Sequence, residues 1–427
     1  MNNVGRVAIL GGARIPVARA HSAYAAATNQ DMLTAAFKSL VDKYSLKGEK
    51  IGEVAAGAVI KHPRDWNLAR ESTLGAGLHP TTPAYDLQRA CGTSLSAIVQ
   101  LGYRIALGEI DSAIGGGADS TSDVPLTYSR GLQRILLEAN RAKTLLERVK
   151  AFSKIRPHHF KPVPPSVGEP RTGMSMGQHC EEMAKEWHIS RVEQDELALA
   201  SHLNAARAWK DGFFDGLVFP FQGLKGDNNV RGDTSLEKLS QLKTAFDRSP
   251  AGTLTAGNSS PLTDGAACVL LGSEEWAKAK GIPVQCYLAF SDTAAVDFVG
   301  MAGPKEGMLM APAYAVSRML DRSGLKLQDF DLYEIHEAFA AQVLCTLKAW
   351  ESEEWCRKRL GKGALGSIDR KKLNPKGSSV AIGHPFAATG ARVVATLAKE
   401  LESRGSGRGL ISICAAGGQG VTAILER

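Results

Sequence analysis

Short apolar runs alternate with helical patterns in the first part of the chain. Residues 4–10, 51–60 and 111–115 are apolar segments bounded by glycine, as expected of buried strands. Residues 31–43 have helical spacing, with an aspartate suited to the first turn of a helix. Residues 91–103 contain no charged side chain, which is typical of a helix inside a large protein. Strands that alternate with helices predict a layered α/β domain.

The pattern becomes helical between residues 126 and 250. A basic helix is predicted over 130–155, and amphipathic helices over 177–188 and 191–210 follow a proline-rich connector. Short apolar strands return afterwards, at 267–271, 285–290, 379–382 and 410–414. These changes predict three units: an α/β half formed by 1–125 with 251–275, a helical loop domain over 126–250, and a second α/β half over 276–427.

The two predicted α/β halves share a weakly similar sequence pattern. In the first, a loop with Cys91 opens a buried helix, and the next strand ends in Gly115, Gly116 and Gly117. In the second, a loop with His384 opens the predicted helix 387–401, and the strand that follows ends in an alanine and glycine run. Two copies of loop, helix, strand and glycine run predict a duplicated α/β fold.

Composition excludes several classes of protein. The chain has 427 residues, of which 44% are hydrophobic and 22% charged, so general disorder is excluded. No apolar run is long enough for a transmembrane helix, and neither end carries a signal or retention pattern. The seven cysteines show no paired spacing, which predicts reduced thiols, no metal site and a cytoplasmic location.

The net charge of +7 is concentrated in one segment. Residues 130–161 hold nine lysines and arginines and two glutamates, an excess equal to the net charge of the whole chain. The segment alternates apolar and basic residues, which favours contact with a membrane surface or a partner protein. Two alternatives remain open: the segment faces an anionic ligand, or it is a solvated basic face. Few aromatic residues are interleaved, which argues against nucleic acid.

Two short motifs fail in their context. Residues 173–177 match the nucleophile elbow G-x-S-x-G, but a proline-rich connector precedes them where a buried strand is required. Residues 361–366 match the dinucleotide fingerprint, but they follow the charged run WCRKRL. Both are predicted to be ordinary loops.

Cys91 and His384 are the first candidates for chemistry. Cys91 precedes an uncharged helix whose N-terminus can stabilise a thiolate, and Gly92 permits close approach of a substrate. His384 lies between a glycine and a proline, which restrict its backbone, and it occupies the matching point of the second half. Packing for Cys91 and solvation for His384 are the alternatives.

Three further residues complete an inventory suited to acyl-thioester chemistry. His336 and Glu337 lie where a predicted strand meets a helix, a position suited either to an oxyanion or to a helix cap. Cys414 ends a predicted strand before a glycine-rich run and could act as a second acid or base. Residues 255–267 are rich in small hydrogen-bonding groups, so this segment is either a ligand-binding loop or a tight turn.

Four blocks together resemble the thiolase family over essentially the whole chain. They are RACGTSLSAI, TAGNSSPLTDGAA, HEAFAAQ, and GHPFAATGAR followed by CAAGGQG. The resemblance implies two similar layered α/β halves and a helical loop domain that holds coenzyme A, which is a co-substrate and not a permanently bound cofactor.

The resemblance also implies a role for each residue. Cys91 would be acylated, His384 would accept the thiol protons, and Cys414 would protonate the acetyl-CoA enolate. His336 would hold an oxyanion-hole water with Glu337 beside it, and the Cys91 and Ala416 amides would form a second oxyanion hole. Coenzyme A would contact Ser260, Arg231, Ala338 and Phe339.

Three positions depart from many relatives. They have asparagine at the position of His336, and the histidine resembles thiolase subunits of the multifunctional fatty-acid oxidation complexes. They have glycine where this chain has Ala416, whose amide remains. Some have a coenzyme-contacting histidine where this chain has Ser175, which puts that contact in doubt.

The predicted reaction is thiolysis of 3-ketoacyl-CoA to acetyl-CoA and a shortened acyl-CoA, which reverses as a Claisen condensation. One alternative is a decarboxylating 3-ketoacyl synthase of the same fold, and another is a largely structural docking subunit. The expected assembly is a homodimer or homotetramer, with a hydratase/dehydrogenase subunit as a possible partner.

Overall fold

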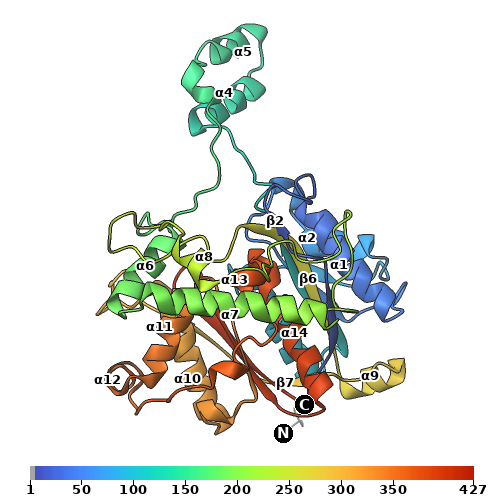
Figure 1. Cartoon of the computed structure of the whole chain (residues 1–427). Coiled ribbons are helices and arrows are strands. Elements are labelled where there is room, and N and C mark those ends of the chain that lie inside the picture. The colour runs from blue at the N-terminus through green and yellow to red at the C-terminus, as the bar shows by residue number, and fades with distance from the viewer. Residues whose placement is uncertain (1–4) are drawn as a thin grey trace.

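The computed structural model describes residues 5–427, so residue 4 of the first predicted strand lies outside it. Ten strands form one mixed sheet in the order β4-β3-β5-β6-β1-β7-β10-β9-β8, and β2 pairs with β6 off this path. Figure 1 labels β2, β6 and β7 of this sheet. The strands are β1 (Val7–Arg14), β2 (Ala18–Arg19), β3 (Glu53–Ala56), β4 (Ala84–Asp86), β5 (Ser112–Asp119), β6 (Thr263–Gly272), β7 (Cys286–Ala295), β8 (Leu332–Ile335), β9 (Arg408–Ala415) and β10 (Gln419–Glu426).

The strand pairing repeats across the sheet. In the first half, β3 and β5 are parallel, while the pairs β5–β6 and β6–β1 are antiparallel. In the second half, β8 and β9 are parallel, while β9–β10 and β10–β7 are antiparallel. The short pairing of β1 with β7 joins the halves. The predicted duplicated α/β fold is therefore confirmed.

Fourteen α-helices are distributed around this sheet in the part of the chain described, from residue 5 onward. They are α1 (Asn29–Lys43), α2 (Leu68–Gly75), α3 (Thr93–Ala106), α4 (Arg130–Arg141), α5 (Leu145–Phe152), α6 (Met176–Glu186), α7 (Arg191–Lys210), α8 (Leu236–Ser240), α9 (Glu274–Lys280), α10 (Ala311–Ser323), α11 (Ala340–Glu351), α12 (Glu353–Trp355), α13 (Ser379–Ile382) and α14 (Thr389–Arg404). None of them is long and apolar enough to cross a membrane.

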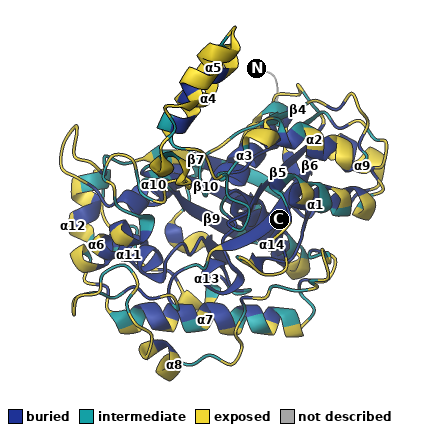
Figure 2. Ribbon diagram, turned by 90° about the horizontal axis from the view of Figure 1, so that it is seen from above, coloured by how far each residue is buried: buried dark blue, intermediate teal, exposed yellow. Residues whose placement is uncertain are grey.

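The helices α3 and α14 lie side by side in the centre of the molecule, where both are mostly buried (Figure 2). The Ala391 amide donates to Ser94 Oγ across them at 2.8 Å. A Cβ at Gly390 would lie 2.3 Å from the Leu95 nitrogen, so only glycine permits this approach. On the outer faces, α1 packs on β5 and β6, and α10 packs on β7 and β10. The two central helices therefore direct their N-terminal ends, which follow Cys91 and His384, toward one place.

The structure corrects two predicted elements. Residues 379–382 form the short helix α13, not a strand. All four are buried, and a short apolar run fits a strand and a buried helical turn equally well. The basic helix predicted over 130–155 is two helices, α4 and α5. Thr144 and Glu147 form a capping box that starts α5, a local signal that the hydrophobic pattern obscured.

Candidate active site

Cys91 and His384 are 293 residues apart in sequence and in direct contact in the structure. The Cys91 sulfur lies 3.1 Å from His384 Nε2. On the other side of the ring, His384 Nδ1 lies 2.6 Å from Thr389 Oγ1, in the first turn of α14. Ala90, just before the cysteine, has a left-handed backbone with φ of 43°. A strained turn and the start of two central helices thus bring a thiol and an imidazole together.

Both members of this pair are neutral at rest. Burial raises the pKa of the Cys91 thiol to about 12, although a hydrogen bond from the Ala416 amide acts in the opposite direction. Burial, with a further contribution from the charge of Arg392, lowers the pKa of His384 to about 3. The sequence predicted that the start of the helix would stabilise a thiolate, but burial dominates. The proton therefore stays on sulfur until substrate is present.

Gly92 has a different neighbour from the one expected. A Cβ at this position would lie 2.8 Å from a methyl carbon of Val421 on β10. The glycine therefore allows β10, from the second half of the chain, to approach the cysteine loop. Close packing between the halves therefore requires glycine at position 92.

Cys414 is the second thiol beside Cys91. It lies near the end of β9 and is buried. Burial, followed by the proximity of Cys91, raises the pKa of its thiol well above the ordinary value. Two residues further on, the Ala416 amide reaches the Cys91 sulfur. The end of β9 therefore brings both a second thiol and a backbone donor to Cys91.

His336 follows β8 and completes the cluster. Its ring lies 4.2 Å from that of His384, centre to centre, and the ligating atoms of Cys91, His336 and His384 all lie within 4.8 Å of one another. Burial, then the charges of His384 and Arg392, lower the pKa of His336 well below its usual value. Its Nε2 atom is buried and has no hydrogen-bond partner among the described residues. A neutral imidazole thus has one nitrogen available within the site.

A buried serine and arginine, which the sequence analysis missed, support His336. Ser379 Oγ lies 2.8 Å from His336 Nδ1 and accepts a hydrogen bond of 2.6 Å from Arg392 Nη2. Both residues are buried, on α13 and α14. The pattern gives no signal for either, because residues 379–382 are predicted as a strand and Arg392 is one position within the predicted helix 387–401.

Glu337 is directed elsewhere. Its carboxylate accepts hydrogen bonds from Ser201 Oγ at 2.7 Å, Asn374 Nδ2 at 2.7 Å and the Val380 amide at 3.2 Å. It is therefore joined to α7 and α13 and is not one of the groups around Cys91. Its position suits an anchor for the loop that carries His336.

Asp119 is a further residue that sequence reasoning missed. It ends β5 and accepts hydrogen bonds from the amides of Val59, Ile60 and Ala387. Burial raises the pKa of its carboxyl to about 6. The contact with Ala387 fixes the turn that follows His384. The signal available in the sequence was an aspartate directly after the glycines of the predicted strand.

Comparison with known proteins places this cluster in a family. Residues 7–275 match the model of the thiolase N-terminal domain, and residues 291–427 match that of the thiolase C-terminal domain. The chain is 42% identical to a 3-ketoacyl-CoA thiolase of Yersinia pestis (strain Pestoides F) over 99% of this chain and 97% of that protein. The same values apply to the 3-ketoacyl-CoA thiolase of Yersinia pseudotuberculosis serotype O:1b.

The chain belongs to the thiolase family. Its structure superposes on the Bacillus anthracis acetyl-CoA acetyltransferase with a TM-score of 0.81 and 30% identity, over the full length of both chains. It also superposes on human mitochondrial 3-ketoacyl-CoA thiolase with a TM-score of 0.81, 26% identity and 99% coverage of each. The thiolase family fold is therefore confirmed along the chain.

In this thiolase, three of the residues that the resemblance assigned to coenzyme A lie together. The Ser260 amide donates to the Ala338 carbonyl at 3.0 Å, and Ser259 forms a bridge with Phe339. The ring of Phe339 packs edge-on against Phe246, 5.7 Å between centres. The segment over 255–267 is thus joined to the loop that carries His336.

Arg231 lies in a neighbouring cleft of about 430 Å³. Arg19, Lys238 and Gly257 also line this cleft, so cations meet the segment just before Ser260. The Arg231 amide donates to His202 Nδ1 at 3.2 Å, and burial and the Arg231 charge lower the pKa of His202 to about 4. The cleft is a mainly cationic hollow beside the Ser260 segment.

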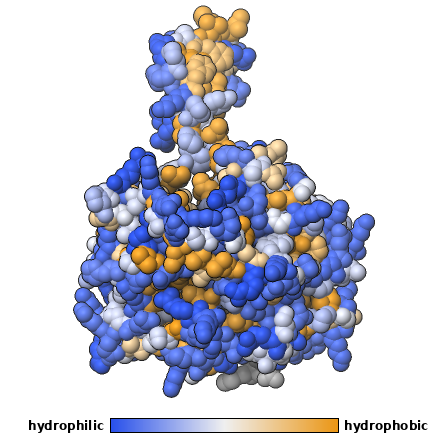
Figure 3. All heavy atoms as spheres, viewed as in Figure 1, coloured by the Kyte–Doolittle hydropathy of each residue, from blue (hydrophilic) through white to orange (hydrophobic). Residues whose placement is uncertain are grey.

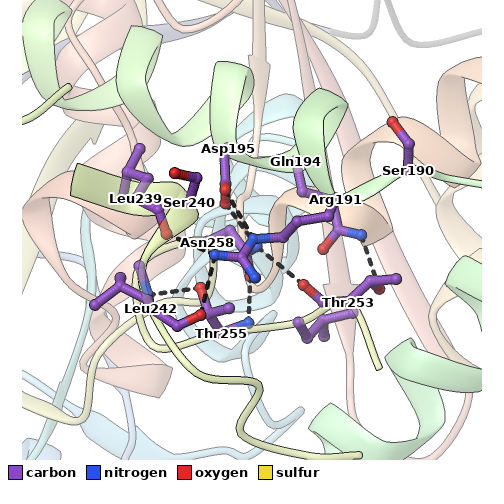
Figure 4. A network of polar contacts seen from close by, with 12 residues as sticks. Ser190, Arg191, Gln194, Asp195, Leu239, Ser240, Leu242, Thr253, Thr255 and Asn258 are labelled. Carbon is purple, nitrogen blue, oxygen red and sulfur yellow. Dashed lines mark hydrogen bonds and ion pairs between the residues drawn. The ribbon is translucent and has the colours of Figure 1, made fainter. Parts of the chain in front are cut away.

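An arginine network holds the wall of this cleft in place (Figure 4). Arg191 Nε donates to Asp195 at 2.7 Å, and its Nη2 donates to the carbonyl of Leu239 at the end of α8. Asp195 also accepts from Asn258 Nδ2 at 3.0 Å. The helix α7 therefore fixes both α8 and the segment before Ser260 (Figure 4).

The G-x-S-x-G match and the dinucleotide-fingerprint match both have structural roles. Ser175 caps the start of α6 through its hydroxyl, so it is not an exposed nucleophile. Gly361 ends a helical turn in the left-handed conformation.

Proposed function

We propose that this thiolase cleaves 3-ketoacyl-CoA with coenzyme A to acetyl-CoA and a shortened acyl-CoA, in fatty-acid β-oxidation. The observation that carries the proposal is the 3.1 Å contact between Cys91 Sγ and His384 Nε2 with a second thiol, Cys414, beside it. The 42% identity to 3-ketoacyl-CoA thiolases over nearly the whole chain supports the substrate class. In reverse, the same groups perform a Claisen condensation.

The first half-reaction forms an acyl-enzyme. Cys91 attacks the 3-keto carbon while His384 Nε2 accepts its proton, and His384 Nδ1–H donates to Thr389 Oγ1. The carbon–carbon bond then breaks, and its electron pair forms the enolate of acetyl-CoA. Cys414 gives its proton to the enolate carbon. Acetyl-CoA leaves, and the shortened acyl group remains on Cys91.

The second half-reaction transfers the acyl group to coenzyme A. The coenzyme thiol loses its proton to the active-site bases and attacks the acyl carbon, and the bond to Cys91 breaks. We assign stabilisation of the tetrahedral oxyanion to the Cys91 and Ala416 amides, which both lie at the Cys91 sulfur. His384 passes the proton that it took from Cys91 to the Cys414 thiolate, then accepts the coenzyme proton and gives it to the departing Cys91 thiolate, so the net reaction balances. The covalent intermediate predicts ping-pong kinetics.

His336 serves the first half-reaction as a donor. Because Arg392 only donates, the hydroxyl hydrogen of Ser379 can point to His336 Nδ1. The neutral ring then carries its proton on Nε2, the nitrogen without a partner in the site. This tautomer holds a water, or the developing oxyanion directly. Glu337 orients the loop and does not react.

We assign coenzyme A to the cationic cleft lined by Arg231. We assign its phosphates to Arg231 and its pantetheine to Ser260, Ala338 and Phe339, with the loop domain 126–250 as one wall. The hydrogen bond between the Ser260 and Ala338 segments places these groups side by side. The helical hairpin of that domain does not line the cleft.

Two alternatives are weaker. A decarboxylating synthase abstracts no carbon-bound proton and has no use for a buried thiol beside the nucleophile, whereas Cys414 is there. A purely structural subunit does not require the Cys91, His384 and Cys414 arrangement.

We also propose that the enzyme is at least a dimer in a reducing compartment such as the cytoplasm. Strand β4 is at one end of the sheet, so its outer edge is available to pair with a second copy. All seven cysteines are free. A hydratase/dehydrogenase subunit remains the proposed partner.

The deciding experiment measures loss of 3-ketoacyl-CoA after addition of coenzyme A. Acetoacetyl-CoA and a long-chain substrate are assayed in parallel, with Cys91→Ser as the control. We expect turnover by the wild type and none by the variant. Absence of turnover on both substrates, together with carbon dioxide release from malonyl-CoA, would replace thiolysis with decarboxylating condensation.

A further inference from the structure

The catalytic cluster also contains a set of side chains that can bind a metal ion. The Cys91 sulfur and one ring nitrogen from each of His336 and His384 all lie within 4.8 Å of one another. Within the described chain, this is the one group of three histidine, cysteine or carboxylate side chains gathered so closely. The cysteine spacing predicts no metal site, because this set comes from three distant segments and only folding assembles it.

The dimensions of the set suit a tetrahedral zinc ion. Zinc binds thiolate sulfur at about 2.3 Å and imidazole nitrogen at about 2.0–2.1 Å, so two tetrahedral ligand atoms lie about 3.3–3.6 Å apart. The Cys91 and His384 atoms, now 3.1 Å apart, have to separate by about 0.5 Å, and no other pair has to close by more than about 1.5 Å. Sulfur and imidazole donors favour zinc over magnesium and calcium, which prefer oxygen ligands.

Hydroxyl groups orient both imidazoles for this role. Thr389 Oγ1 lies 2.6 Å from His384 Nδ1, and Ser379 Oγ lies 2.8 Å from His336 Nδ1. A histidine that binds zinc through one ring nitrogen usually donates the other N–H to an oxygen in this way. The Nε2 atom of His336 is buried and has no hydrogen-bond partner among the described residues. Its lone pair can therefore bind a metal when the ring proton resides on Nδ1.

Zinc would select the tautomer of His336 that the reaction does not use. Catalysis keeps the proton on Nε2, whereas zinc binding moves it to Nδ1, from where it is donated to Ser379 Oγ. That oxygen has two lone pairs, so it accepts this hydrogen bond together with the one from Arg392. The metal-bound and catalytic forms are therefore alternatives.

Binding has to displace one proton. Burial lowers the pKa of both His336 and His384, so both rings are already neutral, and burial raises the pKa of the Cys91 thiol to about 12. The S–H bond breaks, a sulfur–zinc bond forms, and the proton passes to solvent. No electron is transferred. The three ligands leave the fourth tetrahedral position for water.

The other titratable or charged groups that face the cluster keep their state between about pH 7 and pH 9. Burial raises the pKa of Cys414 on β9 well above its ordinary value and that of Asp119 on β5 to about 6. Burial lowers the pKa of Arg392 on α14 to about 10. The thiol is thus protonated, the carboxyl ionised and the guanidinium charged. Zinc affinity should therefore rise about tenfold per pH unit in this range, as release of one proton requires.

We propose that Cys91, His336 and His384 form an inhibitory zinc site. The bound ion occupies the nucleophile and its base together, so the enzyme is inactive while zinc is bound and recovers when a chelator removes the ion. The inhibition rests on the proposed thiolysis. The binding does not, because it depends only on the three side chains.

Titration of the reduced, metal-free chain with cobalt(II) tests the site directly. Cobalt occupies tetrahedral zinc sites, and a bound thiolate gives it a sulfur-to-metal charge-transfer absorption in the near ultraviolet. We expect one cobalt ion per chain with this absorption, which zinc then removes because it binds more tightly. Cys91→Ser should abolish the absorption, and His336→Asn should weaken cobalt and zinc binding about 100-fold or more, because one of three ligands is lost.

Two matched controls remove potential ligands outside the cluster. Cys180→Ala removes a buried thiol of α6. His158→Ala removes an exposed imidazole beside His159, in the short turn Pro157–Phe160 that packs on α4. The hairpin of α4 and α5 projects from the body, so metal bound there is separate from the cluster (Figure 3). Both variants should bind one cobalt ion with the absorption of the wild type.

The outcomes distinguish the site from the reaction. Absence of the absorption in the wild type, or an unchanged one in Cys91→Ser or His336→Asn, would overturn the proposal. Thiolysis of acetoacetyl-CoA that continues with the site filled by zinc would overturn the inhibitory role. The expected absorption in a metal-free enzyme that performs no thiolysis would support the zinc site and contradict the proposed function instead.

Discussion

Replacing Ser379 with alanine should disable His336 without touching the substrate. The change removes the hydroxyl that joins His336 Nδ1 to Arg392. A hydrogen bond between neutral groups contributes about 1 kcal/mol and one to a charged group about 1.5–3 kcal/mol, so unfolding free energy should fall by about 2–4 kcal/mol. The buried Arg392 then lacks this acceptor, and His336 is no longer held with its proton on Nε2.

The catalytic loss follows from the loss of that donor. Removing an oxyanion donor outright lowers kcat about 10²–10³-fold. Ser379→Ala keeps the His336 ring and removes only the hydrogen bond that orients it, so we expect kcat to fall about 10- to 100-fold. KM for coenzyme A should change by less than about twofold, because Ser379 does not line the Arg231 cleft. Steady-state thiolysis and urea denaturation measure the two effects.

Ser378 provides the matched control. Its hydroxyl is buried next to Ser379 but has no hydrogen-bond partner among the described residues. Ser378→Ala should therefore change neither rate nor stability appreciably. In a His336→Asn background, where an amide needs no tautomer, Ser379→Ala should cost little further activity. Equal losses of kcat in Ser379→Ala and Ser378→Ala would refute the reasoning. So would losses of kcat from Ser379→Ala and His336→Asn that simply multiply in the double variant.

Three further predictions address other parts of the molecule. Cys414→Ala should slow thiolysis about 10²–10⁴-fold. Exchange of labelled coenzyme A into acyl-CoA through Cys91 should persist in this variant. Loss of the exchange as well as of thiolysis would argue against a role of Cys414 confined to protonating the enolate. Asp227→Ala should lower the free energy of unfolding, measured by urea denaturation, by about 3–5 kcal/mol. The change leaves the buried Arg14, which is paired with Asp227 at 2.6 and 2.7 Å, without its carboxylate. Asp227→Asn should lower the free energy of unfolding by a smaller amount. Unfolding free energy should fall by about 1.4 kcal/mol per thiol for each pH unit above 9, because the folded state keeps these protons and the unfolded state releases them. Equal melting temperatures at about pH 8 and pH 10 would contradict this. The thiols with raised pKa are Cys91, Cys180, Cys268, Cys286, Cys345, Cys356 and Cys414.

Local pattern was sufficient for most elements of the fold. Helix α1 was predicted at 31–43 and is found at Asn29–Lys43, with a capping box at Thr28. Helix α7 was predicted at 191–210 and has those bounds. The pattern predicts none of the strands β2, β4 and β10, although β10 separates β7 from β9 in the sheet. Strand β10 follows β9 through a tight glycine turn that the sequence analysis treated only as a glycine-rich end.

The sequence alone determined the chemical inventory: two thiols, two histidines and the glycine-rich segments around them, in an order that resembles one family. It also determined where charge is concentrated. These properties depend on residue type and short-range spacing, which the chain carries without folding.

Only the tertiary structure decided how these groups act. It placed His384 against Cys91 across 293 residues, made both neutral by burial, and turned Glu337 away toward Ser201 and Asn374. It added Ser379 and Arg392 behind His336, and it separated the basic hairpin from the cleft. Sheet pairing and burial join residues from distant parts of the chain, and no local pattern specifies those long-range contacts.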